Sequence, residues 1–327
     1  MTETDELIDR VLGAPRTMSS TEVAAAAGMS VEDARGYWRA MGFADVGESH
    51  AFTERDMAAL RAVQRLVSTG VLQRAEAIEV VRSLGQSSAR MAEWQTGTLA
   101  RLLARQGEIP DDNAMSHDHV AKVAELTAAL LPSLEEMLVY AWRRQLAAAI
   151  QRSVDTADTE DATDAGLLCV GFADLVGFTR LTRRLPDARL ADLVTAFEAD
   201  SSDVVAATGA RLIKTLGDEV MFVAEDPEHG AETAIELHLA HAAGEDVPQL
   251  RVGLSFGEVV TRMGDIYGST VNLASRLTAL ARPGTTLADD ACAKELLGDP
   301  RFAVRALRPR PLRGLGLVRA WSVQRGR

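Results

Sequence analysis

The stretch that decides the fold spans residues 210–222 and reads ARLIKTLGDEVMF. Apolar and polar residues alternate as far as Leu216, a Gly-Asp pair interrupts the pattern, and an apolar run resumes at Val220. Alternation of this kind indicates a half-buried strand, and a Gly-Asp pair between two such runs predicts a β-hairpin. A tight turn can point a short carboxylate away from the sheet and toward a ligand. Asp218 has that position, with Lys214 four residues earlier on the strand.

A second aspartate follows another expected strand. Residues 167–173 (LLCVGFA) form an apolar run, and Asp174 comes directly after it. Two carboxylates at neighbouring strand ends suit oxygen-preferring cations such as Mg²⁺ or Mn²⁺. The chain then turns into a helix, and we expect the free backbone N–H groups at this turn to face phosphate oxygens. These N–H groups belong to Leu175, Val176, Gly177, Phe178 and Thr179.

The bulk composition describes an ordinary water-soluble protein. A length of 327 residues predicts two domains, and 47% hydrophobic with 25% charged residues is typical of globular chains. The formal charge of −12 argues against broad attraction to nucleic acid or to an anionic membrane. Two cysteines are too few for a disulfide scaffold. We expect no signal peptide and no membrane span, and therefore a cytoplasmic protein.

The first 105 residues are expected to be helical. A helix that starts after Ser19 or Ser20 should end at Gly28, and Ser30 should cap the next one. This helix-turn-helix resembles the start of MerR-type DNA-binding domains. Residues 1–60, however, hold five Arg, no Lys and eleven Asp plus Glu, a net charge of 5 − 11 = −6. We therefore favour helical packing over DNA binding for this segment.

Three further features divide the chain. A polar loop is expected at 106–119, with His117 and His119 in it, and a helix at 120–154 that is interrupted at Pro132. Residues 155–164 (DTADTEDATD) read as an acidic, flexible or conditionally helical hinge. The expected organisation is an all-helical domain at 1–150, a linker at 151–165 and a second domain at 166–327.

The second domain alternates strands with helices, which predicts an α/β sandwich with a mostly antiparallel sheet. Besides the 210–224 hairpin, strands are expected at 167–173, 250–256, 258–263, 303–307 and 319–323, with the second and third of these meeting across Gly257. Helices are expected at 177–184, 187–207, 228–243 and 271–281.

A third informative stretch, DIYGSTVNLASR, covers residues 265–276. Asn272 and Arg276 are four residues apart, so both side chains project from one helix face. A paired amide and guanidinium can orient a ribose and stabilise charge on a phosphoryl group. Taken alone this signal is weak, because Asn and Arg on a helix are usually solvated.

The three stretches together strongly resemble the class III nucleotidyl cyclase catalytic domain. The motifs are FADLVGFT (172–179), KTLGDEVMF (214–222) and DIYGSTVNLASRL (265–277), and the match covers residues 165 to 325, about half of the chain. The resemblance implies an α+β, ferredoxin-like catalytic domain preceded by an all-α regulatory domain. By residue, it implies that two divalent metal ions bind Asp174 and Asp218, that Lys214 and Asp265 recognise adenine, that Asn272 orients the ribose, and that Arg276 steadies the transition state.

The same resemblance implies an adenylate cyclase that converts ATP to 3′,5′-cyclic AMP and pyrophosphate by a two-metal mechanism. Asp265 can accept from the exocyclic amine of adenine, whereas guanine presents a carbonyl at that place, so ATP is favoured over GTP. The 3′-oxygen attacks the α-phosphorus within one nucleotide, and metal activation removes the need for a general base.

The resemblance also implies a head-to-tail homodimer with two sites. One protomer contributes the metal aspartates and the other contributes the four remaining residues, so a monomer should be inactive. The N-terminal half resembles the helical regulatory domains of actinobacterial cyclases, a group with acid-responsive members. We expect that half to be regulatory, through a proton or a small molecule, and the helix that ends near Val154 to transmit the change. A catalytically silent cyclase-like sensor and a DNA-binding regulator are the alternatives.

Overall fold

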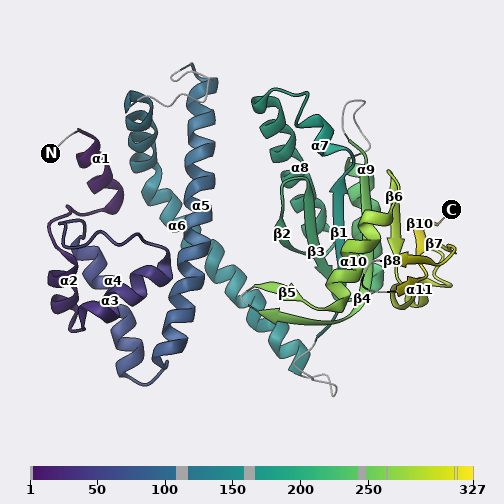
Figure 1. Cartoon of the computed structure of the whole chain (residues 1–327), viewed down its shortest axis with the longest axis horizontal. Helices are drawn as coiled ribbons and strands as arrows, with labels where there is room; N and C mark the ends of the chain where they lie inside the picture. Colours follow the sequence, from purple (N-terminus) through teal and green to yellow (C-terminus); the bar gives the residue numbers. More distant parts are fainter. Residues whose placement is uncertain are drawn as a thin grey trace. The chain divides into compact units, whose positions relative to one another are not determined.

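The structure is a computed structural model, and it describes residues 3–107, 117–157, 166–241, 248–262, 264–312, 314 and 316–326 (Figure 1). The chain divides into two compact units, Met1–Ile150 and Gln151–Arg327. The first is helical and the second is built on a mixed sheet, which confirms the expected α+β class. Within the described residues, no helix has the length and apolar character needed to cross a membrane.

Six helices account for the described part of the first unit: α1 (Glu3–Leu12), α2 (Ser20–Ala27), α3 (Val31–Met41), α4 (Glu54–Ser68), α5 (Arg74–Arg105) and α6 (His117–Ala157). The expected helix boundaries are confirmed by their caps. The Ser19 side chain accepts from the backbone N–H of Glu22, and Ser30 caps α3 in the same way. Gly28 ends α2 in the left-handed conformation, at φ 76°.

The helix-turn-helix formed by α2 and α3 packs into the hydrophobic core of this unit. Trp38 of α3 stacks on Phe52, with ring centroids 4.1 Å apart. The helix α3 also packs against α5, and a Cβ on Gly85 of α5 would lie 2.3 Å from the carbonyl oxygen of Met41. One face of α3, the second helix of this helix-turn-helix, is therefore used for packing, which agrees with the preference drawn from the charge of residues 1–60.

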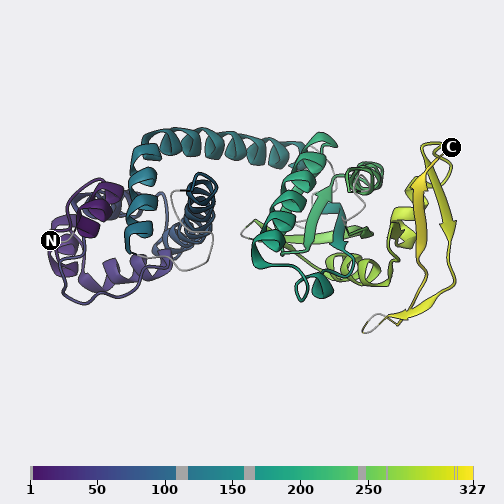
Figure 2. The ribbon, with the colours of Figure 1, turned by 90° about the horizontal axis from the view of Figure 1, so that it is seen from above.

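The long helix α6 differs from the sequence expectation at both ends. It begins at His117, so His117 and His119 lie in its first turn and not in a loop; Asp118 places a negative charge at the positive end of the helix dipole there. Helical hydrogen bonding continues past Pro132, and Figure 2 shows α6 bent along its length. The helix extends to Ala157, which makes the first part of the expected linker helical. Residues 108–116 and 158–165 lie outside the described part.

The second unit is organised around a sheet with the strand order β2-β3-β1-β4-β6-β10-β7, to which β5 is added on β4. All of these neighbours are antiparallel except β4 and β6, which are parallel. The strands are β1 (Gly166–Leu175), β2 (Arg211–Thr215), β3 (Glu219–Ala224), β4 (Leu250–Arg262), β5 (Asp265–Tyr267), β6 (Thr285–Ala288), β7 (Phe302–Ala306) and β10 (Trp321–Arg325). A separate hairpin joins β8 (Arg310–Leu312) and β9 (Gly316–Val318).

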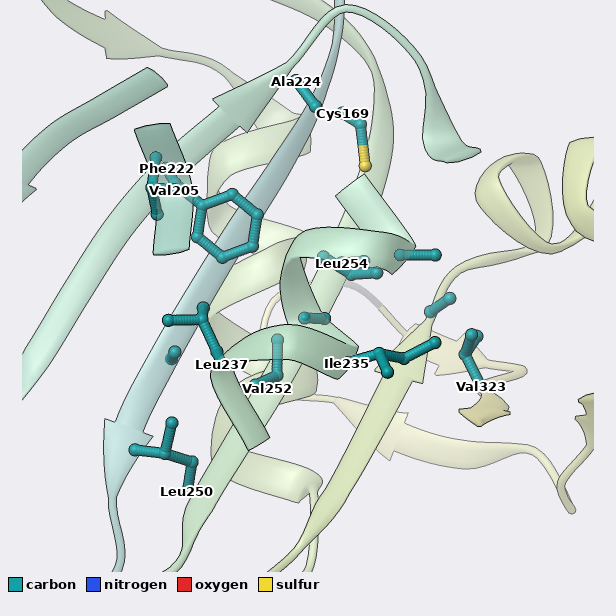
Figure 3. Packing of buried hydrophobic residues seen from close by; sticks show 14 of the residues in the cluster. Cys169, Val205, Phe222, Ala224, Ile235, Leu237, Leu250, Val252, Leu254 and Val323 are labelled. Carbon is teal, nitrogen blue, oxygen red and sulfur yellow. The ribbon is translucent and has the colours of Figure 1, made fainter. Parts of the chain in front are cut away.

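Helices cover both faces of this sheet (Figures 1 and 2). On one side α8 (Asp187–Ala207), α9 (Pro227–Ala240) and α11 (Asp290–Leu296) enclose the larger core, part of which is drawn in Figure 3. On the other side α10 (Ser269–Leu280) covers a smaller core. Residues of β1 alternate between the two: Cys169 and Ala173 belong to the first core, and Val170 and Phe172 to the second.

One expected element is wrong. The two strands thought to meet across Gly257 are one continuous strand, β4, in which Gly257 pairs with Leu168 of β1. A Cβ on Gly257 would lie 2.9 Å from the Thr270 hydroxyl of α10. This glycine is therefore a packing position and not a turn. The expected helix at 177–184 is also shorter, as α7 (Phe178–Leu181), and β5, β6, β8, β9 and α11 were not anticipated.

Candidate active site

The predicted hairpin forms and carries Asp218 at its tip. Strands β2 and β3 pair antiparallel, Gly217 has φ +70°, and the N–H of Leu216 donates to the carbonyl of Glu219 at 2.7 Å. The backbone of the tip is also fixed to the neighbouring strand, because the N–H of Leu175 donates to the carbonyl of Asp218 at 2.9 Å. The turn therefore holds Asp218 beside the end of β1, where Asp174 lies.

Asp174 is buried, at 8% exposure, and paired with a cation that the sequence analysis did not identify. Arg251 Nε donates to Asp174 Oδ2 at 2.5 Å, and the two residues face each other across β1 and β4. Burial raises the pKa of Asp174, the Arg251 guanidinium opposes that effect, and the charge of Asp218 adds to it. Burial likewise raises the pKa of Glu219, with Asp174 and Asp218 contributing.

These side chains fit a magnesium-type site. In the described part of the chain, no three His, Cys, Asp or Glu side chains are grouped so as to hold a metal ion by themselves. Asp174 and Asp218 nevertheless supply hard oxygen donors at one edge of the sheet. Mg²⁺ is commonly held by one or two carboxylates together with water and substrate phosphates, so two acids suffice when a polyphosphate completes the shell.

The expectation for the backbone N–H groups needs a correction. The N–H groups of Leu175 and Val176 are not free, because they donate to the carbonyls of Asp218 and Gln249, each at 2.9 Å. The register of β1 with its neighbours extends two residues further than the sequence suggests. The N–H groups of Gly177, Phe178 and Thr179 open the short helix α7, and their contact with phosphate stays a prediction.

Lys214 and Asp265 form an ion pair between β2 and β5. Lys214 Nζ lies 2.6 Å from Asp265 Oδ2, and the backbone N–H of Ile266 donates to Asp265 Oδ1 at 2.8 Å. The side chains are 33% and 28% exposed, so both stay accessible to a ligand. Burial of Asp265 acts to raise its pKa, but the hydrogen bonds from Lys214 and Ile266 outweigh it, and the pKa is lowered. Asp265 is thus held as an ionised acceptor.

Asn272 and Arg276 occupy the exposed side of α10, as expected from their spacing. The opposite side of this helix is anchored by the buried residues Ala274 and Leu277. The backbone of α10 sits directly on β4, since a Cβ on Gly253 would meet the backbone N of Thr278 at 2.3 Å. The height of α10 above the sheet, and with it the placement of the amide and guanidinium, depends on that glycine.

The six residues fall into separate groups within one protomer. Along β4, Arg251 faces Asp174 and Arg262 faces Asp265. These two positions are eleven residues apart along β4, whereas Lys214, which holds Asp265, belongs to the same hairpin as Asp218. Arg251 is the functional candidate that the sequence analysis missed. Its signal was available, because it is a single charged residue in the otherwise apolar strand LRVGLSF.

Comparison with known families agrees with this fold. The family described as "Adenylate and Guanylate cyclase catalytic domain" matches residues 161–324. An adenylate cyclase of Streptomyces coelicolor is 46% identical over 96% of this chain and 88% of its own length. The chain therefore belongs to the class III nucleotidyl cyclase family, which confirms the resemblance carried by the three motifs.

Two further relatives extend the likeness through the helical unit. An adenylate cyclase of Glutamicibacter nicotianae is 38% identical over 97% of this chain and 81% of its own length. A protein named pH-sensitive adenylate cyclase, from Mycobacterium tuberculosis, is 32% identical over 94% of this chain and 78% of its own length. The crystal structure of the adenylyl cyclase CyaB from P. aeruginosa covers 50% of this chain and 96% of its own, with 22% identity and a TM-score of 0.44.

Proposed function

We propose that this protein is an adenylate cyclase that converts ATP to 3′,5′-cyclic AMP and pyrophosphate. The observation that carries the proposal is the Lys214–Asp265 pair at 2.6 Å, which presents a donor and an ionised acceptor side by side. Adenine offers the complementary pair, a ring nitrogen and an exocyclic amine. Relatives named adenylate cyclase at 38–46% identity over nearly the whole chain support the same activity.

Selection against GTP follows from the same two side chains. Guanine places a carbonyl where adenine has its amine, so the Asp265 carboxylate would face an acceptor and lose its hydrogen bond. A site built to hydrogen-bond one substrate rejects an analogue that leaves its polar groups unpaired. The accompanying backbone donation from Ile266 fixes the carboxylate in place, so it does not turn away from the wrong base.

Each group of site residues has its own proposed role in the attack of the ribose 3′-oxygen on the α-phosphorus. Two divalent ions held by Asp174 and Asp218, Mg²⁺ or Mn²⁺, would lower the pKa of the ribose 3′-hydroxyl and neutralise the triphosphate. Asn272 orients the ribose, and Arg276 stabilises the charge that develops at the α-phosphorus. Arg251, beside Asp174, adds a guanidinium within reach of the phosphates.

The site is proposed to be shared between two copies of the chain. Asp174 pairs with Arg251 near the start of β4, whereas Asp265, on β5, pairs with Arg262 at the far end of β4. Asn272 and Arg276 face outward from α10. A twofold-related partner can bring its own Lys214, Asp265, Asn272 and Arg276 to the first protomer's carboxylates, giving two equivalent sites per dimer.

The test is a direct assay of the purified full chain with ATP or GTP and either Mg²⁺ or Mn²⁺. We expect cyclic AMP from ATP and at least about 10-fold less cyclic product from GTP. Asp218→Ala should lower the rate by about 100-fold or more while the fold is retained. No cyclic AMP with either metal between pH 5.5 and 8 would instead favour a cyclase-like sensor.

We also propose that pH regulates the cyclase activity through the helical unit. One of the relatives carries pH sensitivity in its name, and its match spans the helical unit as well as the catalytic one. Protonation of histidines or of clustered acids in the helical unit would shift the balance between a less active and a more active arrangement. The pH profile of cyclic AMP formation should change when residues 1–150 are removed. An identical profile for residues 151–327 would remove the idea.

A further inference from the structure

One exposed arginine lies over the turn that follows β1. The guanidinium of Arg180 approaches Gly177: its Nη2, Nε and Cζ atoms lie 3.4, 3.7 and 3.9 Å from the position that a Cβ on this glycine would occupy. Side chains of a helix lean toward its N-terminus, so the third residue of α7 reaches back over the turn. The N–H of Arg180 also donates to the carbonyl of Gly177 at 2.9 Å. The Arg180 side chain and the backbone of Gly177 therefore border the same piece of surface.

This turn lies next to the proposed cation site. Gly177 is three residues after Asp174, which limits the distance between them to about 11 Å. The backbone between them is fixed by hydrogen bonds to neighbouring segments of the unit. Figure 1 shows α7 at the end of the sheet where β1 finishes. A phosphate chain whose first oxygens bind a cation on Asp174 can therefore extend to Arg180.

Arg180 is available to an anionic ligand. Among the side chains that the structure describes, no carboxylate forms an ion pair with it. Residues 175–186 contain three arginines and neither Asp nor Glu, in a chain with a net charge of −12. The neighbouring edge of the sheet is acidic, and burial together with the charges of Asp174 and Asp218 raises the pKa of Glu219 there. A polyanionic substrate that enters beside these carboxylates needs positive charge to offset their repulsion.

We propose that Arg180 binds the γ-phosphate of ATP, an assignment that rests on the proposed cyclase function. A guanidinium presents parallel N–H groups that match two phosphate oxygens, and such charge-assisted hydrogen bonds are about twice as strong as neutral ones. The α-phosphate has to lie against the cations and the attacking 3′-oxygen. The terminal phosphate is therefore the part of the chain that can reach a residue further along the turn.

This contact should affect substrate binding and not the chemical step. The bond that breaks joins the α-phosphorus to the oxygen it shares with the β-phosphate, so the charge on the γ-phosphate changes little. Loss of an interaction that is equally strong in the ground state and the transition state raises KM and leaves kcat unchanged. We expect Arg180→Gln to raise KM for ATP about 10-fold, with kcat within about 2-fold of the parent value. Arg180→Lys keeps the charge but not the planar fork, so KM should rise only about 3-fold.

Equilibrium binding without turnover tests which phosphate is bound. The analogue 3′-deoxy-ATP lacks the attacking hydroxyl group, and 3′-deoxy-ADP lacks the γ-phosphate as well. In titration calorimetry of the full chain with Mg²⁺, Arg180→Gln should bind 3′-deoxy-ATP about 10-fold more weakly than the parent chain and 3′-deoxy-ADP equally well. Arg183→Gln removes the same charge from the same stretch at another exposed position, and it should bind both analogues like the parent chain.

The outcomes separate this contact from the proposed activity. If the chain makes cyclic AMP but Arg180→Gln binds both analogues like the parent, the contact is overturned and the activity stands. Equal losses in Arg180→Gln and Arg183→Gln would also overturn it, because the effect would then be one of general charge. An equal loss of affinity for both analogues would show that Arg180 does not bind the γ-phosphate. Selective loss of 3′-deoxy-ATP affinity in a chain that makes no cyclic AMP would support the contact while the proposed activity fails.

Discussion

At the residue scale, the chemistry of the site rests on which charged groups hold one another. Asp174 is buried against Arg251, whereas Asp265 is partly exposed and receives donors from Lys214 and Ile266. The first carboxylate has a raised pKa and the second a lowered one. The same residue type thus has two different environments, which suit the proposed roles of Asp174 in binding a cation and of Asp265 in recognising a base.

Replacing Asp265 by Asn should loosen the choice of nucleotide. The amide can turn its NH₂ toward a guanine carbonyl, which the carboxylate cannot do. We expect the ratio of kcat/KM for ATP to that for GTP to fall by about 10-fold or more in Asp265→Asn. Stability should change by less than about 1 kcal/mol, because the Lys214–Asp265 pair is about one-third exposed. An unchanged ratio would show that this pair does not read the base.

At the scale of single elements, the sequence predicts those features that depend only on residues close together in the chain. The Gly217-Asp218 turn, the Ser19 and Ser30 caps and the Gly28 stop depend on neighbouring residues, and all were anticipated. Gly257 was misread because a glycine in a strand looks the same whether it makes a turn or admits a helix. The lone charge in LRVGLSF could have marked Arg251 as a candidate, but its partner Asp174 lies 77 positions away, so no local pattern reveals the pairing.

Gly253→Ala tests how closely α10 must lie on the sheet. The added methyl group would meet the backbone N of Thr278 and the carbonyl oxygen of Ala274 at 2.3 and 2.4 Å, so the helix has to move. We expect a loss of about 1–3 kcal/mol in the free energy of unfolding, with a drop in kcat as Asn272 is displaced. Gly36→Ala in α3 is the matched control. It meets no atom within 4 Å and should be neutral or stabilising by up to about 1 kcal/mol.

The end of α9 gives a prediction about acid stability. Burial, with a contribution from nearby His241, lowers the pKa of His238, whose ring Nε2 lies 3.0 Å from the Thr286 hydroxyl. A lowered pKa favours the neutral ring in the folded state. The stability it contributes is present above the unfolded value of about 6.5 and is lost as the pH falls through the folded value.

His238→Gln should therefore flatten the acid side of the stability curve. In urea unfolding between pH 7.5 and 5, the wild-type chain should lose up to about 1.4 kcal/mol per pH unit more than the variant below pH 6.5. Equal slopes for the two proteins would mean that His238 is not the titrating group.

At the scale of the whole molecule, the proposed dimer can be tested by complementation. Asp218→Ala removes a residue from the cation half of each site, and Arg276→Ala removes one from the nucleotide half. In a 1:1 mixture half of the dimers are mixed, and each mixed dimer keeps one of its two sites intact. We therefore expect about a quarter of the wild-type rate from two proteins that are inactive alone.

The control mixture combines Asp218→Ala with Asp174→Ala. Both changes affect the cation half, so every site of a mixed dimer carries one lesion and the rate should not recover. Recovery in neither mixture, with subunit exchange verified by mass spectrometry, would place a complete site within one chain.

The contact between Arg251 and Asp174 has a consequence for the order in which ligands arrive. In the proposed site, the guanidinium and a cation would compete for the same carboxylate. A cation that enters by itself has to displace Arg251 and leave that charge without an anion. A cation that enters on a nucleotide brings phosphate oxygens with it, so Arg251 changes partners instead of losing one. Metal and ATP should therefore bind as a single complex, and the metal alone only weakly.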